Sequence, residues 1–144
     1  MSNIVKSALK LMESTAKEAG DQFLQTSFTK NFCRLHLGYE LDEVFSVVFL
    51  DNQNRLLSCE NIFRGTINQA PIYPRAIVRK VIEHNSAAVV LMHNHPSGHI
   101  NPSESDINAT EDIKKILEII DCKVIDHIIV GRGGAFSFAE NNYL

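Results

Sequence analysis

Residues 91–106, LMHNHPSGHINPSESD, gather side chains that commonly bind metals or transfer protons. His93 and His95 follow an apolar run, and residues two apart in extended backbone face the same side, about 6.6 Å apart. Their imidazoles can therefore lean onto one ion at about 2.0–2.1 Å. Pro96 favours an extended conformation for His95. Asp106, in the first turn of an expected helix, lies near enough to supply a third, anionic ligand.

Two histidines and one carboxylate leave a tetrahedral ion one ligand short. An open position is typical of a catalytic zinc, which binds water there and lowers its pKa to about 7. The same ligand types also suit non-haem iron, so the pattern predicts a metal without choosing between these two. For Ser103 and Asp106 there is a purely structural alternative. They have the spacing of a helix N-cap and the acid that hydrogen-bonds back to it.

The elements that must position these residues can be read from the hydrophobic period. Two amphipathic helices are predicted first, over residues 3–19 and 24–38. A hairpin of two strands, 44–50 and 55–63, comes next, and a helix over 74–85 follows it. A buried strand over 87–92, a helix over 103–120 and two strands over 123–131 and 135–140 complete the chain. Residues 65–74 are predicted to form a loop. Helices interleaved with a mixed sheet indicate a compact α/β layer fold.

Length and composition fit one globular domain. The 144 residues are 44% hydrophobic and 22% charged, which argues against disorder. A net charge of -3 argues against a protein that coats nucleic acid. Cys33, Cys59 and Cys122 form no CxxC pair, so reduced thiols are expected. No stretch approaches the roughly 20 apolar residues of a membrane span, and a soluble, cytoplasmic protein is expected.

The order HxH, seven residues, Ser, two residues, Asp resembles the JAMM (MPN+) metalloprotease signature, in the form found in the RadC family. FLDNQNRLLSCENIFRGTIN, YPRAIVRKVIEHNSAAVVLMHNHPSG and VIDHIIVG also resemble RadC, so the similarity covers about residues 41–140. It implies a JAMM/cytidine-deaminase-like α/β fold, with a mixed sheet flanked by helices. It also implies one zinc, with His93, His95 and Asp106 as its ligands.

The resemblance also implies a division of the chain. Residues 41–144 form the RadC-like JAMM domain, and residues 1–40 form an N-terminal helical segment with two extra helices. Longer RadC proteins carry a helix-hairpin-helix region ahead of this domain. Residues 1–40 are shorter and contain no Gly-x-Gly hairpin of that kind, so a DNA-binding role through that region does not carry over.

The JAMM pattern requires a glutamate upstream of the histidine pair, and Glu60, in SCENIF, is predicted to be that general base. The alternative is a solvent-facing Glu60 on an edge strand, with Glu83 and Asp126 as fallback bases. The Ser103 hydroxyl is expected to hydrogen-bond the oxyanion. His127, in IDHII, matches the family outside the ligand pattern. A buried, hydrogen-bonded histidine is favoured there, and support of a metal ligand is the alternative.

The leading functional prediction is a zinc-dependent hydrolase, metallopeptidase- or isopeptidase-like, in which zinc-bound water attacks an amide carbonyl of an unidentified peptide or protein. The alternative is a zinc-binding, non-catalytic module with a DNA-repair-associated or partner-binding role. A nucleobase deaminase would need HxE and PCxxC motifs, and neither occurs. The apolar faces of the N-terminal helices leave a homodimer open. A modest basic face, or simply solvated charge, is predicted at Arg64, Arg75, Arg79 and Lys80.

Overall fold

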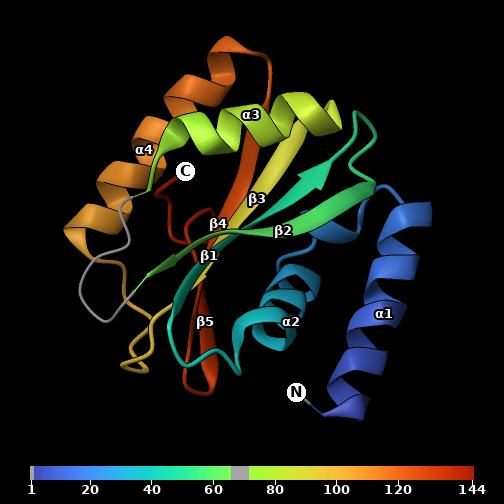
Figure 1. The fold of residues 1–144 in the computed structure, drawn as a ribbon, viewed down its shortest axis with the longest axis vertical. Coiled ribbons are helices and arrows are strands. Elements are labelled where there is room, and N and C mark those ends of the chain that lie inside the picture. The colour runs from blue at the N-terminus through green and yellow to red at the C-terminus, as the bar shows by residue number, and fades with distance from the viewer. Residues whose placement is uncertain (1, 66–71) are drawn as a thin grey trace.

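The structure is a computed structural model that describes residues 2–65 and 72–144 (Figure 1). Its helices are α1 (Asn3–Glu18), the short 3-10 helix η1 (Gln22–Leu24), α2 (Thr26–Leu37), α3 (Pro74–His84) and α4 (Glu104–Ile119). Its strands are β1 (Glu43–Leu50), β2 (Leu56–Gly65), β3 (Ala88–Asn94), β4 (Lys123–Gly131) and β5 (Gly134–Ser137). The predicted fold class, a mixed α/β sheet flanked by helices with two further helices at the N-terminus, is confirmed.

The sheet brings the start of one strand beside the end of another. Its strand order is β2-β1-β3-β4-β5. β1 runs antiparallel to both β2 and β3, while β3 and β4 are parallel and joined through α4. In this register Phe45, near the start of β1, pairs with His93, near the end of β3. The histidines that leave β3 therefore face residues that enter β1 from the preceding loop.

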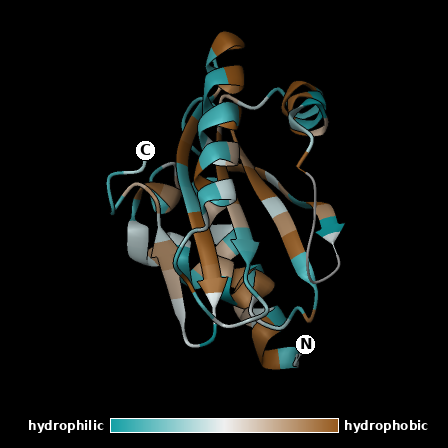
Figure 2. Cartoon of the chain, turned by 90° about the vertical axis from the view of Figure 1, so that its left-hand side faces the viewer, coloured by the Kyte–Doolittle hydropathy of each residue, from teal (hydrophilic) through white to brown (hydrophobic). Residues whose placement is uncertain are grey.

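Two clusters of buried apolar side chains fill the two faces of the sheet, and the helices divide between them (Figure 1). The cluster beneath α1 and α2 includes Leu9, Phe32, Val48, Val90 and Met92. The cluster beneath α3 and α4 includes Ile77, Ile113, Val47, Val89 and Leu91. Figure 2 shows the hydrophobic colour concentrated on the strands between these layers. His93 alternates with Met92 along β3, so its side chain lies on the α3 and α4 side of the sheet.

Most predicted elements are present, and the main difference lies at the C-terminus. The strand predicted over 135–140 ends at Ser137, and the chain then turns. The turn follows because the Ser137 hydroxyl and the Ala139 N–H both donate to Asp126 of β4. The loop predicted over 65–74 falls largely on residues 66–71, outside the described part of the chain.

Two further expectations bear on the chain as a whole. All three cysteines are free thiols, as their scatter along the sequence predicted. Among the helices of residues 2–65 and 72–144, none is both long and apolar enough to cross a membrane. The division between residues 1–40 and 41–144 stays a prediction.

Candidate metal centre

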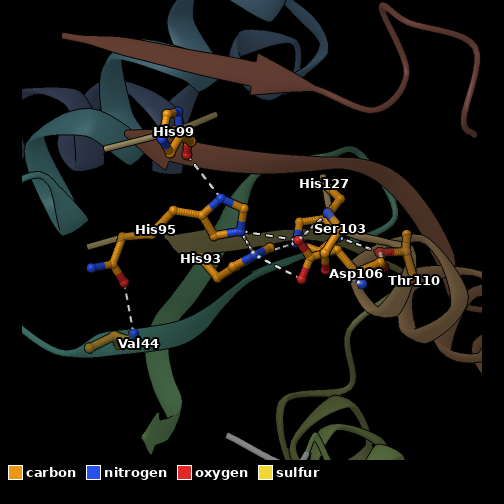
Figure 3. Close-up of polar contacts among 9 residues, drawn as sticks. Val44, His93, His95, His99, Ser103, Asp106, Thr110 and His127 are labelled. Carbon is orange, nitrogen blue, oxygen red and sulfur yellow. Dashed lines mark hydrogen bonds and ion pairs between the residues drawn. The ribbon is translucent and has the colours of Figure 1, made fainter. Parts of the chain in front are cut away.

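Three predicted ligands converge at the end of β3 (Figure 3). The Nε2 atoms of His93 and His95 are 3.0 Å apart. Oδ1 of Asp106 lies 3.3 Å from Nε2 of His93, and Oδ2 lies 3.0 Å from Nε2 of His95. The structure thus brings together a pair of side chains from one strand and a carboxylate from the following helix.

The backbone around the histidines is held by both neighbouring strands. The His95 N–H donates to the carbonyl oxygen of Val130 on β4, at 2.9 Å. Asn94 points to the other face, where its amide oxygen accepts from the N–H of Val44 at 2.7 Å and its NH₂ donates to the carbonyl oxygen of Asp42 at 2.9 Å. Asn94 is 4% exposed, so the bond with Val44 is buried and the bond with Asp42 is partly buried. Asn94 therefore fixes the start of β1 against the end of β3.

Asp106 reaches the histidines from the first turn of α4, and Ser103 orients it. Ser103 is the N-cap of α4, and its hydroxyl oxygen accepts from the Asp106 N–H at 3.0 Å. In return, Oδ2 of Asp106 accepts from the Ser103 N–H at 2.9 Å. The capping box that the sequence offered as the structural alternative is present, and the same carboxylate faces the histidines. The two interpretations of this spacing are therefore compatible.

Hydrogen bonding fixes which nitrogen of His95 carries the hydrogen. Nδ1 lies 2.9 Å from the carbonyl oxygen of His99. A carbonyl oxygen can only accept, so Nδ1–H donates and the neutral ring carries its lone pair on Nε2. When the ring gains a proton on Nε2 it can donate to Asp106, and this hydrogen bond raises the pKa of His95. Burial opposes ionisation of Asp106, but the contacts with the His93 and His95 rings, together with the hydrogen bond from the Ser103 N–H, outweigh it and hold its pKa below the ordinary value.

This donor set fits a cation. The lone pair of His95 and the oxygens of ionised Asp106 point at one place, and no lysine or arginine of the described residues forms an ion pair with Asp106. A tetrahedral ion with ligands at about 2.0–2.1 Å separates its ligand atoms by about 3.3 Å. The observed spacings of 3.0–3.3 Å are close to that value. The residues present could therefore hold a divalent metal with little movement.

A second carboxylate borders the histidines from β1. An oxygen of Glu43 lies within 4.8 Å of the ring nitrogens of His93 and His95, and the three form a group that could hold a metal. Glu43 forms no ion pair with either histidine among the described residues, so it stands farther off than Asp106 does. Because Phe45 pairs with His93, Glu43, two residues earlier, lies on the same face of the sheet. The Glu43 carboxylate therefore lies close to the histidines from the side of β1.

The structure does not bring Glu60 to these residues. Glu60 lies on β2, which β1 separates from β3, and it pairs with Val47 rather than with the start of β1. Two strand spacings alone amount to about 10 Å. The carboxylate instead contacts His84 and forms an ion pair with Lys80 at 3.3 Å, both on α3. The hydrogen bond with His84 is the main cause of its lowered pKa.

The two fallback bases also lie elsewhere. Glu83, on the exposed side of α3, pairs with Arg79 and Lys80. Asp126 is buried on β4, where it accepts from the His127 N–H and the Ser137 hydroxyl, and burial raises its pKa. It alternates with His127 along the strand and so faces away from the histidine pair. Glu43, which the sequence prediction missed, is the acid that the fold brings to the centre.

His127 is buried and hydrogen-bonded, as favoured from the sequence, and it also contacts a predicted ligand. Its Nε2 lies 2.7 Å from Nδ1 of His93, and its Nδ1 lies 2.6 Å from Oγ1 of Thr110 (Figure 3). The ring stacks on Phe138 and meets Phe45 edge-on. Burial holds its pKa well below the ordinary value. The favoured description is therefore confirmed, and the contact with His93 is the one that support of a proposed ligand would require.

The predicted basic face is largely neutralised. Arg64 pairs with Glu40 at 3.0 Å, and Arg79 pairs with Glu83 at 3.9 Å. Lys80 pairs with Glu60 and Glu83. These contacts match the interpretation of solvated charges better than that of a surface for phosphates.

The fold and the centre together define an α/β domain with a His-His-Asp set at the end of a central strand. Residues 24–143 match the family described as RadC-like JAB domain, and the chain belongs to this family. The UPF0758 protein IL0240 of Idiomarina loihiensis is 45% identical over 127 residues, covering 88% of this chain and 57% of that protein. Smlt0399 of Stenotrophomonas maltophilia, also a UPF0758 protein, is 50% identical over 102 residues, covering 71% and 44%.

The UPF0758 protein YkfG of Escherichia coli is similar over nearly its whole length. It is 39% identical over 141 residues, which is 98% of this chain and 89% of that protein. Against the other two relatives, the chain spans about half of their length.

Proposed function

We propose that this domain is a zinc-dependent hydrolase that cleaves an amide or isopeptide bond in a peptide or protein. His93, His95 and Asp106 hold the metal, Glu43 serves as the general base, and Ser103 stabilises the oxyanion. When bound, zinc would polarise the carbonyl group and lower the pKa of a water molecule. Membership of the RadC-like JAB domain family supports this class of chemistry without fixing the metal or the reaction.

Glu43 takes the role that the sequence predicted for Glu60. A general base must lie within reach of the proton it abstracts, directly or through one water. The Glu43 carboxylate is close to the histidine pair but not in contact with it. It can therefore take a proton from the attacking water and deliver it to the leaving amine. Glu60 is engaged by Lys80 and His84 at another place in the sheet.

Ser103 can cap the helix and assist the reaction with the same hydroxyl. Its oxygen accepts from the Asp106 N–H, which uses one lone pair and leaves the hydroxyl hydrogen free to donate. Its place beside a metal ligand suits a donor to the oxygen on which negative charge develops. Removing a donor of this kind typically lowers kcat about 10²–10³-fold.

The observation that carries the proposal is the convergence of His93, His95 and Asp106 to 3.0–3.3 Å without a lysine or arginine partner in the described residues. Acceptor atoms packed this closely repel one another unless a proton or a metal ion lies between them. A second carboxylate at the rim then gives such a metal centre a base.

Metal analysis of the purified protein, paired with a peptide-library cleavage screen, tests the proposal. The original protein and Glu60→Gln should each hold about one zinc per chain, and His95→Ala should hold none. Glu43→Gln should keep its zinc but lose cleavage. Full zinc in His95→Ala would end the ligand assignment. Zinc retained with no cleavage of any peptide would favour the non-catalytic binding module instead.

A further inference from the structure

We propose that Thr110 and His127 are positioning residues that fix the tautomer of His93 through a chain of directed hydrogen bonds. The chain leaves the hydrogen of His93 on Nδ1 and turns the lone pair of Nε2 toward the metal centre. The inference rests on the proposed function, because it concerns how His93 is prepared to bind a metal. It adds two residues, from α4 and β4, that touch neither the metal nor the substrate.

The chain starts at Thr110, whose hydroxyl has one hydrogen and two close neighbours. Oγ1 lies 2.7 Å from the carbonyl oxygen of Asp106 and 2.6 Å from Nδ1 of His127. The Asp106 carbonyl oxygen carries no hydrogen. Without a hydrogen between them, this oxygen and Oγ1 of Thr110, only 2.7 Å apart, would repel each other. The hydroxyl hydrogen therefore points to Asp106, and Oγ1 must accept from His127. Nδ1 of His127 carries that hydrogen.

The hydrogen on Nδ1 of His127 determines which atom donates in the next hydrogen bond, between His127 and His93. A neutral imidazole has one N–H and one lone pair, so a hydrogen on Nδ1 of His127 leaves Nε2 as an acceptor. That atom lies 2.7 Å from Nδ1 of His93, which must then be the donor. The remaining nitrogen of His93, Nε2, has the lone pair and faces His95 and Asp106.

Because these side chains are buried, water cannot compete with the Thr110–His127–His93 hydrogen bonds or change their direction. His93 and His127 are 2% and 1% exposed, and Thr110 is 1% exposed. Phe45 lies against both rings and Phe138 stacks on His127 at 4.5 Å. Without solvent donors or acceptors, the two nitrogens of His127 and Nδ1 of His93 each depend on one protein neighbour.

The two proposed imidazole ligands are prepared by different means. Nδ1 of His95 faces a backbone carbonyl oxygen, which can only accept and so sets the tautomer alone. Nδ1 of His93 faces another imidazole, which could donate or accept. In addition, the Asp106 carboxylate, 3.3 Å from Nε2 of His93, would attract a hydrogen to that nitrogen. A further residue must therefore fix the tautomer of His127, and Thr110 is that residue.

Ring-nitrogen NMR of the metal-free protein, labelled with ¹⁵N-histidine, tests the chain directly. A protonated and an unprotonated ring nitrogen differ clearly in ¹⁵N shift, which reports the tautomer. His93 should carry its hydrogen on Nδ1 in the original protein and in Thr110→Ser, which keeps the hydroxyl. In Thr110→Val, nearly isosteric but without the hydroxyl, the Nε2–H form should grow at the expense of Nδ1–H.

Zinc affinity, measured by competition with a chelating dye, gives a second readout. Thr110→Val should bind zinc about 10–100-fold more weakly, as found when outer partners of metal-binding histidines are removed, whereas Thr110→Ser should stay within about threefold of the original. Thr110→Ala replaces Thr110→Val if the latter does not fold by circular dichroism. A His93 that carries its hydrogen on Nε2 in the original protein, or that keeps Nδ1–H in the variants without the hydroxyl, would overturn the proposal.

The two proposals fail in different ways. Absence of zinc in the original protein would refute the metal site while the metal-free spectra still report the direction of the chain. Normal zinc content, with a tautomer of His93 indifferent to Thr110, would refute the directing role alone.

Discussion

Within residues 2–65 and 72–144, two clusters place a carboxylate against histidine, and one of them resembles a site for chemistry. At the end of β3, Asp106 contacts His93 and His95 with no lysine or arginine paired to it in the described chain. Between β2 and α3, Glu60 contacts His84 and also pairs with Lys80. The second cluster therefore contains a cation of its own, Lys80, whereas no lysine or arginine of the described residues pairs with the carboxylate of the first.

The difference teaches how to separate a metal centre from a surface ion pair. In the second cluster Lys80 supplies a positive charge to Glu60, and all three side chains are about 30% exposed. Such contacts contribute little and are weakened by salt. In the first cluster His93 is nearly fully buried and its partners are mostly buried, so unbalanced acceptors there are costly. The absence of a lysine or arginine partner in the described residues, more than the residue types, is the reason for proposing the first cluster as a metal centre.

Removal of the carboxylate ligand should have the largest effect. Asp106→Ala should abolish stoichiometric zinc and all hydrolysis, because two imidazoles alone bind the ion weakly. The variant also loses half of the capping box, so Ser103→Ala is the matched control. That control loses about 1 kcal/mol of stability but keeps its zinc. Equal zinc loss in both variants, by elemental analysis, would assign the effect to the helix end instead of the ligand.

Exchange of the two candidate bases is the next test. Glu43→Gln should lower kcat by about 10²–10⁴-fold with zinc retained, because the general base is lost but the ligands remain. Glu60→Gln should stay within about twofold of the original, since its charge serves Lys80 and His84. Steady-state kinetics on one cleaved peptide would measure both. The reverse ranking would return the role of the base to Glu60.

The Asn94 contacts predict an intermediate effect on stability. Asn94→Ala leaves the Val44 N–H and the Asp42 carbonyl oxygen without their buried partner, which should cost about 1–3 kcal/mol in unfolding free energy. Urea denaturation at neutral pH measures this cost. Because Glu43 lies between those two backbone groups, kcat should fall as well. A variant with unchanged stability would show that the strand ends are held by other contacts.

The smallest expected effect is the pH dependence of the Glu60 cluster. The pKa of Glu60 is lowered by His84, so its contribution is present above the ordinary pKa of glutamate and disappears as pH falls through the lowered value. Glu60→Gln should therefore cost about 0.5 kcal/mol near pH 6 and almost nothing at strongly acidic pH. Urea titrations of both proteins at several pH values measure the difference.

The metal-free centre should show the opposite sign. The pKa of His95 is raised by Asp106, so that contribution is complete below the ordinary pKa of histidine and is lost as pH rises through the raised value. In the same titrations, a His95→Gln variant should therefore differ most from the metal-free original at acidic pH. A difference that grows toward alkaline pH would contradict this assignment.

The convergence of the ligands could be predicted from sequence because it depends on local structure. His93 and His95 share a strand, and Asp106 follows within one loop and one helical turn, so alternation and the N-cap spacing nearly define their geometry. The α/β fold was equally predictable, since its elements have clear hydrophobic periods.

Glu43, the proposed base, could not be selected from the sequence because its place beside the histidines depends on strand pairing. β1 and β2 form one hairpin, and the sequence does not say which of them lies next to β3. With β1 adjacent and antiparallel, an acid at the start of β1 meets the end of β3. Asp42 and Glu43 are adjacent in the chain there. Only the pairing register of β1 with β3 determines which of the two carboxylates faces the histidines. Thr110 was missed because nothing in its helical pattern separates it from other small core residues.

One side chain joins the two parts of the proposed centre without belonging to either. Asn94 lies between His93 and His95 in the chain and hydrogen-bonds the backbone on both sides of Glu43, so the sheet itself holds the proposed base at its distance from the proposed ligands. The loop from Pro96 to Pro102 plays no part in that distance, and its one contact with the centre is the backbone carbonyl oxygen of His99, which accepts from His95. Because a backbone carbonyl is present whatever the side chain, the side chains of this loop could change without altering the distance between Glu43 and the histidines.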